Sequence, residues 1–259
     1  MEKNNANQTL ARAWQLYKSG FGTFFKVAFI AAAFVEYLYV YLINHHINFS
    51  SMEDQSADVP TGMFWLSVIT LAVMIMVTGF IIARGGSQVK NPEASSSSEL
   101  NKIATRLLME RLGTFTLVYI TSVILLVGAS AFLSVVGMWL VTTFTLVLYP
   151  AVLVGKQRFI GAYRQSVKWA GSDIWYTFQL ALIVVGLWLL DHVLRAILGY
   201  GFEAQDDSIS FGVQQVIVIF INAVIMPLGL MIAVAAYERF SQKPAEQAVG
   251  SATASETQE

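Results

Sequence analysis

The sequence predicts an all-α membrane protein with six transmembrane helices, and three observations lead to this fold class. Of the 259 residues, 56% are hydrophobic and only 13% are charged, whereas soluble domains carry about a quarter charged residues. Several long runs contain almost no charge, and each is long enough for an α-helix to cross a hydrocarbon core about 30 Å thick. Along the chain, loops rich in Lys and Arg alternate with loops that contain neither.

Four of the predicted spans are separate apolar stretches with polar or charged flanks, at residues 24–43, 62–83, 174–198 and 212–237. Two further spans lie in one uncharged run, residues 112–155, which as a single helix would be roughly twice as long as the core is thick. We therefore expect this run to fold back through a tight turn at residues 133–137, where small residues gather. The six spans then form three helical hairpins.

Two alternatives to this assignment are weaker. A cleaved signal peptide could account for the first span, but a long polar segment precedes it and no clear small-residue cleavage site follows. A large soluble helical protein could account for the whole chain, but its helices would need charged faces at helical spacing, which these runs lack.

The basic residues predict how the spans are oriented. Fifteen of the 16 Lys and Arg residues lie before or at the start of the first span, in the second and fourth loops, or in the C-terminal segment, and the exception is Arg195. The loops at residues 44–61 and 199–210 contain no Lys or Arg and carry carboxylates instead. Because basic residues in short loops resist translocation, both termini are predicted to lie in the cytoplasm.

A short segment precedes each span that runs outward, and we expect each segment to be a cytoplasmic interfacial amphipathic helix. The segments at residues 9–19, 99–111 and 159–170 combine apolar residues at helical spacing with Lys or Arg. Gly-Thr-Phe at 22–24 and at 113–115, and Gly-Ser at 171–172, predict a joint between each helix and its span. These helices would either bind lipid headgroups or cover the inner face of the bundle.

The predicted organisation is a single membrane domain, residues 1–240, followed by a disordered cytoplasmic tail, residues 241–259. The domain includes a flexible cytoplasmic linker at residues 85–98, which contains Gly-Gly, Asn-Pro and four consecutive serines. Linker and tail are polar or rich in small residues, so neither is expected to bury enough apolar surface to fold alone.

A cluster of polar residues inside the spans is the candidate functional site. A charge at the centre of a span costs about 2.5–3.5 kcal/mol on insertion scales, so each charge there calls for an explanation. The cluster consists of Glu36 in the first span and Asp191, His192 and Arg195 at similar depth in the fifth. In the structural interpretation Asp191 and Arg195 pair at i, i+4, and Glu36 bonds to His192 or to a backbone donor. In the functional interpretation the cluster responds to protons or substrate near the outer surface; simple snorkelling is a third explanation.

The sequence offers little indication of thiol chemistry, metal binding, catalysis or nucleic-acid binding. The chain has no Cys, which excludes disulfides, thiolate metal sites and thiol nucleophiles. His45 and His46 are adjacent and would point in different directions, so no metal or cofactor site is predicted. No catalytic nucleophile motif or phosphate-binding loop occurs, and a net charge of −1 gives no attraction to nucleic acid. The chain is therefore not expected to be an enzyme.

Three short stretches carry a resemblance to a known family: Val135-Val136-Gly137, Tyr149-Pro150-Ala151-Val152, and Gly161-Ala162-Tyr163-Arg164-Gln165-Ser166-Val167-Lys168-Trp169. This pattern resembles the YciC-type family of uncharacterised six-span bacterial inner-membrane proteins, which is similar to the membrane domain of some glycerophosphoryl diester phosphodiesterases. The opening Arg12-Ala13-Trp14 also fits, whereas Val136 stands where the family often has Pro. The resemblance implies an interfacial or structural motif that consists of Trp14, Gly137, Pro150, Arg164 and Ser166.

The resemblance implies a multi-pass protein of the bacterial cytoplasmic (inner) membrane, without a phosphodiesterase domain and with an undefined role, for which envelope or lipid homeostasis is the expectation. Together with the absence of catalytic motifs, this favours a non-enzymatic protein that acts through the lipid bilayer or through membrane-protein partners. The alternative is a small-solute or lipid transporter that uses the outer polar cluster.

Overall fold

The computed structural model describes residues 6–46, 61–92, 96–203 and 208–256, and within them the side chains of residues 6–38, 64–92, 96–198 and 213–242. The regular structure in these ranges is helical throughout. Seven helices are present there: α1 (Ala6–His46), α2 (Thr61–Lys90), α3 (Ser97–Thr145), α4 (Leu148–Leu153), α5 (Phe159–Ser172), α6 (Ile174–Glu203) and α7 (Ser208–Glu256).

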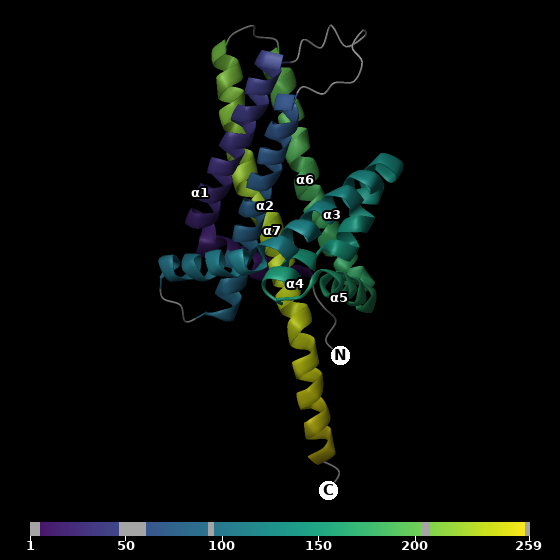
Figure 1. Ribbon diagram of the computed structural model, residues 1–259. Helices are drawn as coiled ribbons and strands as arrows, with labels where there is room; N and C mark the ends of the chain where they lie inside the picture. The colour runs from purple at the N-terminus through teal and green to yellow at the C-terminus, as the bar shows by residue number, and fades with distance from the viewer. Residues whose placement is uncertain (1–5, 47–60, 93–95, 204–207, 257–259) are drawn as a thin grey trace.

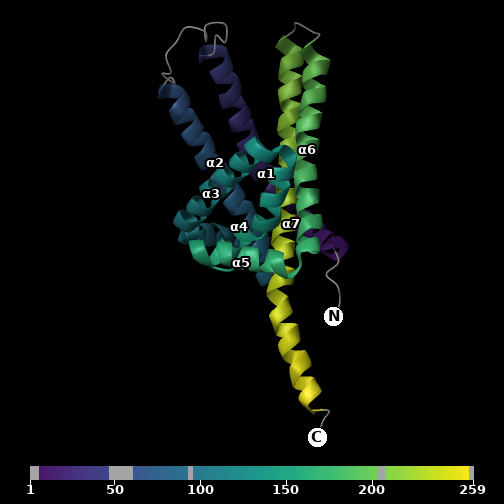
Figure 2. The same cartoon turned by 90° about the vertical axis from the view of Figure 1, so that its right-hand side faces the viewer.

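The axes of four long helices, α1, α2, α6 and α7, are roughly aligned with one another (Figure 1). Helix α3 crosses them obliquely, and the short helices α4 and α5 lie beside α7 (Figure 2). Helix α1 packs mainly against α7, and α1 begins at the end of the bundle toward which α7 runs. Helix α7 therefore runs in the opposite direction to α1. Helix α6 runs in the same direction as α1 (Figure 1).

The apolar helices indicate a multi-pass membrane protein. In the described part of the chain, five helical stretches are long and apolar enough to cross a membrane: Ala6–Leu38, Phe64–Lys90, Ser97–Leu153, Ile174–Leu198 and Val213–Gln242. Large apolar side chains are also widely exposed on the surface; Phe132, for example, is 88% exposed. Such a surface would be unfavourable in water and is suited to contact with lipid.

The third apolar stretch contains a sharp break. Ser134 has φ 53° and ψ −138°, outside the helical range, and the α3 segment folds back on itself along its length (Figure 1). The break lies inside the turn predicted at residues 133–137. Gly137 follows it, and a Cβ atom at that position would collide with the backbone of Ala129 in the preceding arm. Residue 137 therefore needs to be glycine so that the two arms can approach closely.

The arm that follows the break is interrupted a second time. Helix α3 ends at Thr145 and α4 begins at Leu148, so the fourth predicted span is divided into two helical pieces. The cause is Pro150, because a proline ring clashes with the carbonyl group four residues earlier, here that of Leu146. Pro150 falls in the first turn of α4, where the lack of an amide hydrogen is tolerated.

The predicted joints between interfacial helices and spans occur at only one of three places. Gly22 lies within α1 and Gly113 within α3, and both helices continue through these positions. A glycine inside a helix costs only about 1 kcal/mol relative to alanine, less than the backbone hydrogen bonds lost at a break. At the third place α5 ends at Ser172, and Asp173, with φ −151° and ψ 68°, separates it from α6. There the joint is present.

The predicted linker and tail are more helical than expected. Helix α2 continues to Lys90, so most of the predicted linker, residues 85–98, belongs to α2 or α3; residues 93–95 lie outside the described part. Gly85 and Gly86 are buried, and a Cβ atom at Gly85 would lie 2.6 Å from the Met231 side chain. Helix α7 continues to Glu256, through most of the tail predicted at 241–259. The alanines of that segment favour helix.

Replacement of Gly86 by alanine tests whether these glycines are needed for close packing. The added Cβ atom would collide with the side chain of Val154, the residue that follows α4, and overpacking of this kind costs about 1–3 kcal/mol. We expect Gly86→Ala to lower the free energy of unfolding measured by denaturant titration in detergent micelles. Gly113→Ala is the matched control, because a Cβ atom there meets nothing within 4 Å, and it should leave stability unchanged or slightly higher. Equal stability of the two variants would contradict the packing role.

Candidate functional site

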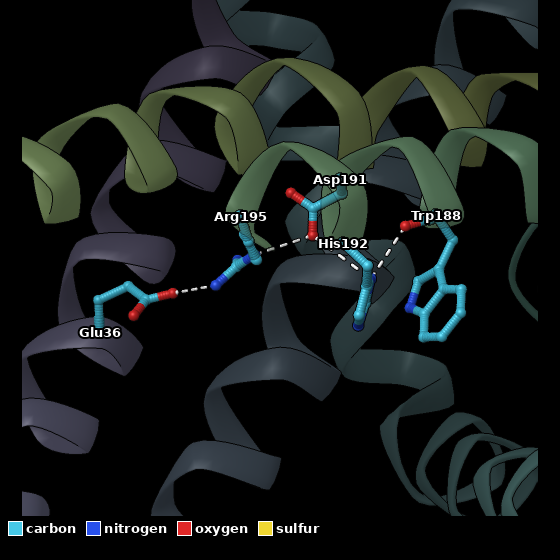
Figure 3. A network of polar contacts seen from close by, with 5 residues as sticks. All are labelled: Glu36, Trp188, Asp191, His192 and Arg195. Carbon is cyan, nitrogen blue, oxygen red and sulfur yellow. Dashed lines mark hydrogen bonds and ion pairs between the residues drawn. The ribbon is translucent and has the colours of Figure 1, made fainter. Parts of the chain in front are cut away.

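Arg195 joins the two carboxylates of the predicted polar cluster (Figure 3). Its Nε donates to Asp191 Oδ2 at 3.0 Å on the same helix, α6, and its Nη1 donates to Glu36 Oε1 of α1 at 2.7 Å. The predicted i, i+4 pair of Asp191 and Arg195 is confirmed. The expectation that Glu36 bonds to His192 or a backbone donor is wrong, because the planar guanidinium group presents donors on two edges and reaches both carboxylates.

His192 lies beside this cluster but binds mainly within its own helix. Its Nδ1 is 2.9 Å from the carbonyl oxygen of Trp188 and 3.8 Å from Asp191 Oδ2. A carbonyl oxygen only accepts hydrogen bonds, so Nδ1 carries the hydrogen. The imidazole lies against the Trp188 indole with 3.8 Å between ring centroids. The His192 side chain is about half exposed.

The cluster has an excess of acceptors. The side chains of Glu36 and Asp191 are only 12% and 10% exposed, and one guanidinium group serves both. With His192 neutral, Glu36, Asp191 and Arg195 together carry a net charge of −1. Asp191 Oδ1 is also buried without a hydrogen-bond donor among the described residues, and Figure 3 shows it directed toward α7. A buried acceptor without a partner is costly, so the cluster is suited to receive a donor.

A cavity of about 720 Å³ adjoins the cluster and is lined chiefly by α1, α6 and α7. Glu36, Asp191 and Arg195 lie at the end toward which α1 and α6 run. The rest is lined mainly by apolar side chains such as Ala28 and Val184, together with the polar side chains of Thr142, Thr145, Tyr149 and Asn222. Along α6 the lining extends from Val184 to Arg195, about 16 Å of helix. This arrangement fits a molecule with an apolar body and one polar end.

The remaining motif residues do not join this site. Trp14 is about half exposed, stacks on Tyr17 with 5.5 Å between centroids and has Lys18 Nζ 5.2 Å above its ring. Arg164 is exposed on α5, and the places of Gly137 and Pro150 are described above. Ser166 is buried, and its Oγ donates to the carbonyl oxygen of Phe144 at 2.7 Å. Ser166 thereby satisfies a carbonyl group that the end of α3 leaves without an amide partner.

Sequence reasoning missed a buried cation. Arg84 was assigned to a cytoplasmic loop, but it lies in α2 and is only 2% exposed. Its Nε donates to Asn101 Oδ1 at 2.9 Å. In the amide orientation of Gln88 that satisfies both of its ends, the Gln88 oxygen accepts from Arg84 Nη1 at 3.0 Å. No sequence signal separates this arginine from the exposed ones, because its burial depends on how α2 and α3 pack together.

A second contact that the sequence did not predict attaches the start of α1 to α7. The guanidinium group of Arg12 binds Glu238 of α7 through two hydrogen bonds, from Nε at 2.9 Å and from Nη2 at 3.0 Å. Bidentate pairs of this kind fix geometry as well as charge. The two residues are 226 positions apart in the chain, so their pairing could not be anticipated from spacing.

Metal binding finds no support in the part of the chain that the structure describes, where no group of three His, Cys, Asp or Glu side chains could hold an ion. The side chains of His45 and His46 lie outside that part. Comparison of the chain with protein-family models, with curated proteins and with solved structures finds no match.

Replacement of Arg195 tests whether it balances the two carboxylates. Arg195→Gln leaves Glu36 and Asp191 without their cation, and breaking a buried ion pair in this way costs on the order of 3 kcal/mol. We expect a matching decrease in the free energy of unfolding, measured in detergent micelles. The triple variant Glu36→Gln/Asp191→Asn/Arg195→Gln removes all three charges and should recover most of the loss. A triple variant as unstable as Arg195→Gln would show that the charges are not the cause.

Proposed function

We propose that the chain is a non-enzymatic, multi-pass protein of the bacterial cytoplasmic membrane that binds a lipid-like amphiphile in the cavity next to Arg195. The observation that carries this proposal is the cavity itself. It has an apolar body and, at one end, two carboxylates that share a single guanidinium group. Binding through lipid contacts agrees with the expected role in envelope or lipid homeostasis and requires no catalytic residues.

The membrane assignment draws on three kinds of support. The apolar helices have the length and composition of membrane spans. The distribution of Lys and Arg favours six spans in three hairpins with both termini in the cytoplasm. The resemblance of the segment from Val135 to Trp169 to YciC-type proteins favours the bacterial inner membrane. In this arrangement Glu36 and Arg195 lie toward the outer leaflet.

The amphipathic segments that precede the outward spans would contact lipid headgroups on the cytoplasmic side. Trp14, with Lys18 over its ring, has the properties of an interfacial anchor. Helix α5 has exposed Arg164 and Lys168 beside exposed Ile160, which suits a position at the boundary between headgroups and hydrocarbon. Membrane-protein partners could approach the same face.

The polar end of the cavity favours a particular head group on the bound amphiphile. The net negative charge of the cluster and the unsatisfied Asp191 Oδ1 call for a hydrogen-bond donor or a cation. An amine or hydroxyl head fits both requirements, whereas a carboxylate or phosphate head would meet repulsion from Glu36 and Asp191. The apolar chain would extend along α6 toward Val184.

Filling the cavity tests this proposal. Gly229 of α7 lines the cavity, and a Cβ atom there meets nothing within 4 Å, so Gly229→Phe occupies the space without an immediate clash. We expect it to reduce labelling by a diazirine-bearing fatty amine at least about tenfold, a change of ~1.4 kcal/mol in binding free energy. Intact-protein mass spectrometry measures the labelling.

The control is Gly186→Phe, because Gly186 is exposed on α6, is equally open and does not line the cavity. This variant should be labelled like the unmodified protein, and the corresponding fatty acid should label both proteins less than the amine does. Unchanged labelling of Gly229→Phe, or stronger labelling by the acid, would contradict the proposal.

Transport of a small solute or lipid through the same cavity is the second candidate function. The observation that favours it is the unbalanced charge of the cluster, which a proton or a cationic substrate would neutralise. Glu36→Gln and Asp191→Asn variants that keep their expression but lose substrate uptake in reconstituted vesicles would establish transport. Unchanged uptake in these variants would exclude a role of the cluster in transport.

A further inference from the structure

A second cleft, of about 1120 Å³, lies between α1 and the start of α3, apart from the cavity at Arg195. Its lining contains no carboxylate and includes three cationic side chains, Lys26, Lys102 and Arg106. Around these cations stand five hydroxyl side chains: Ser19, Thr23, Ser97, Ser98 and Thr105. Thr23 of α1 and Ser97 of α3 approach within 3.3 Å of each other through their hydroxyl oxygens, which fixes the distance between the two walls.

Two of the three cations are uncompensated. Lys26 and Lys102 are exposed and form no ion pair with any side chain that the structure describes. Arg106 differs, because its Nε binds Glu110 at 3.0 Å in an exposed i, i+4 pair, an interaction of little energy. Ser19 and Thr105 already donate to backbone carbonyl oxygens, which leaves Ser98 and one hydroxyl group of the Thr23–Ser97 pair as donors. The cleft thus presents positive charge beside hydroxyl donors, which is the chemistry that binds phosphate.

Arg84 adds a buried positive charge directly behind the wall of the cleft. It is 2% exposed, and its hydrogen bonds go to the neutral side chains of Asn101 and Gln88. No carboxylate among the described residues forms an ion pair with it. Buried charges normally have a partner of opposite sign. Asn101 lines the cleft, so an anion bound there would lie one side chain away from Arg84.

We propose that this cleft binds the phosphate group of an anionic membrane phospholipid. Lys26 and Lys102 contact the phosphate oxygens, and the hydroxyl groups of Thr23 and Ser98 donate to them. The lining also includes Val27 and Phe80, which provide apolar contacts for the glycerol and the first part of an acyl chain. These contacts favour a phospholipid over a free phosphate. The cleft is independent of the amphiphile cavity and would face the cytoplasmic leaflet.

The test compares two pairs of charge removals in the full-length protein in nanodiscs. Native mass spectrometry measures the binding of phosphatidylglycerol, with phosphatidylcholine as the lipid that lacks a net negative charge. Lysines near a membrane surface attract anionic lipid, and we expect Lys26→Gln/Lys102→Gln to weaken phosphatidylglycerol binding at least about tenfold. The control, Lys156→Gln/Arg158→Gln, removes two exposed cations between α4 and α5, outside the cleft, and should change binding little. Equal loss in both pairs would show diffuse attraction and overturn the site.

A single substitution separates binding from folding. Asn101→Asp keeps an oxygen acceptor for Arg84, supplies the counter-charge that Arg84 lacks, and places a negative charge in the cleft. We expect the lipid-free variant to melt at a higher temperature than the unmodified protein and to bind phosphatidylglycerol at least about tenfold more weakly. Unchanged phosphatidylglycerol binding would overturn the proposal. Equally tight binding of soluble glycerol phosphate would replace the phospholipid by a free phosphate and would overturn the lipid assignment.

Discussion

The structure depends on hydrocarbon as its solvent. Lipid accepts exposed side chains such as Phe132, but it offers no hydrogen bonds to the backbone and no stabilisation to charges. Each interruption of an apolar helix, and each charge within the bundle, therefore needs a nearby group that hydrogen-bonds to it or neutralises it. Where α3 ends before Pro150, Ser166 donates to the Phe144 carbonyl oxygen. Where charge enters the bundle, Arg195 binds both nearby carboxylates and so connects α1 with α6.

Helix α1 lines both of the proposed binding regions. Its residues from Ser19 to Val27 form a wall of the phosphate cleft, and those from Ala28 to Glu36 form a wall of the amphiphile cavity. The two regions have opposite electrostatic character, with unpaired lysines in the first and an excess carboxylate charge in the second. Arg12 fixes the start of the helix to Glu238 of α7. Helix α1 thus lines both a proposed site for an anion and a proposed site for a hydrogen-bond donor or cation.

The sequence predicted the features that depend on local pattern. Apolar length located the long helices, small residues located the break at Ser134, and i, i+4 spacing predicted the pair of Asp191 and Arg195. Prediction from the sequence failed where contacts between residues far apart in the chain determine the structure. Gly85 and Gly86 resembled a flexible linker, but they are buried in α2 because other helices approach them closely. The pairing of Glu36 with Arg195 and the burial of Arg84 likewise depend on contacts between helices.

The proposed topology has both ends of the chain on one side of the membrane, and it would place the phosphate cleft and the polar cluster at Arg195 at opposite leaflets. The chain has no Cys, so single cysteines at positions 56, 96, 208 and 251 can be probed in intact cells with a membrane-impermeant thiol reagent. We expect labelling at positions 56 and 208 only. Labelling at 96 or 251 would contradict this topology and would reverse the placement of both proposed sites.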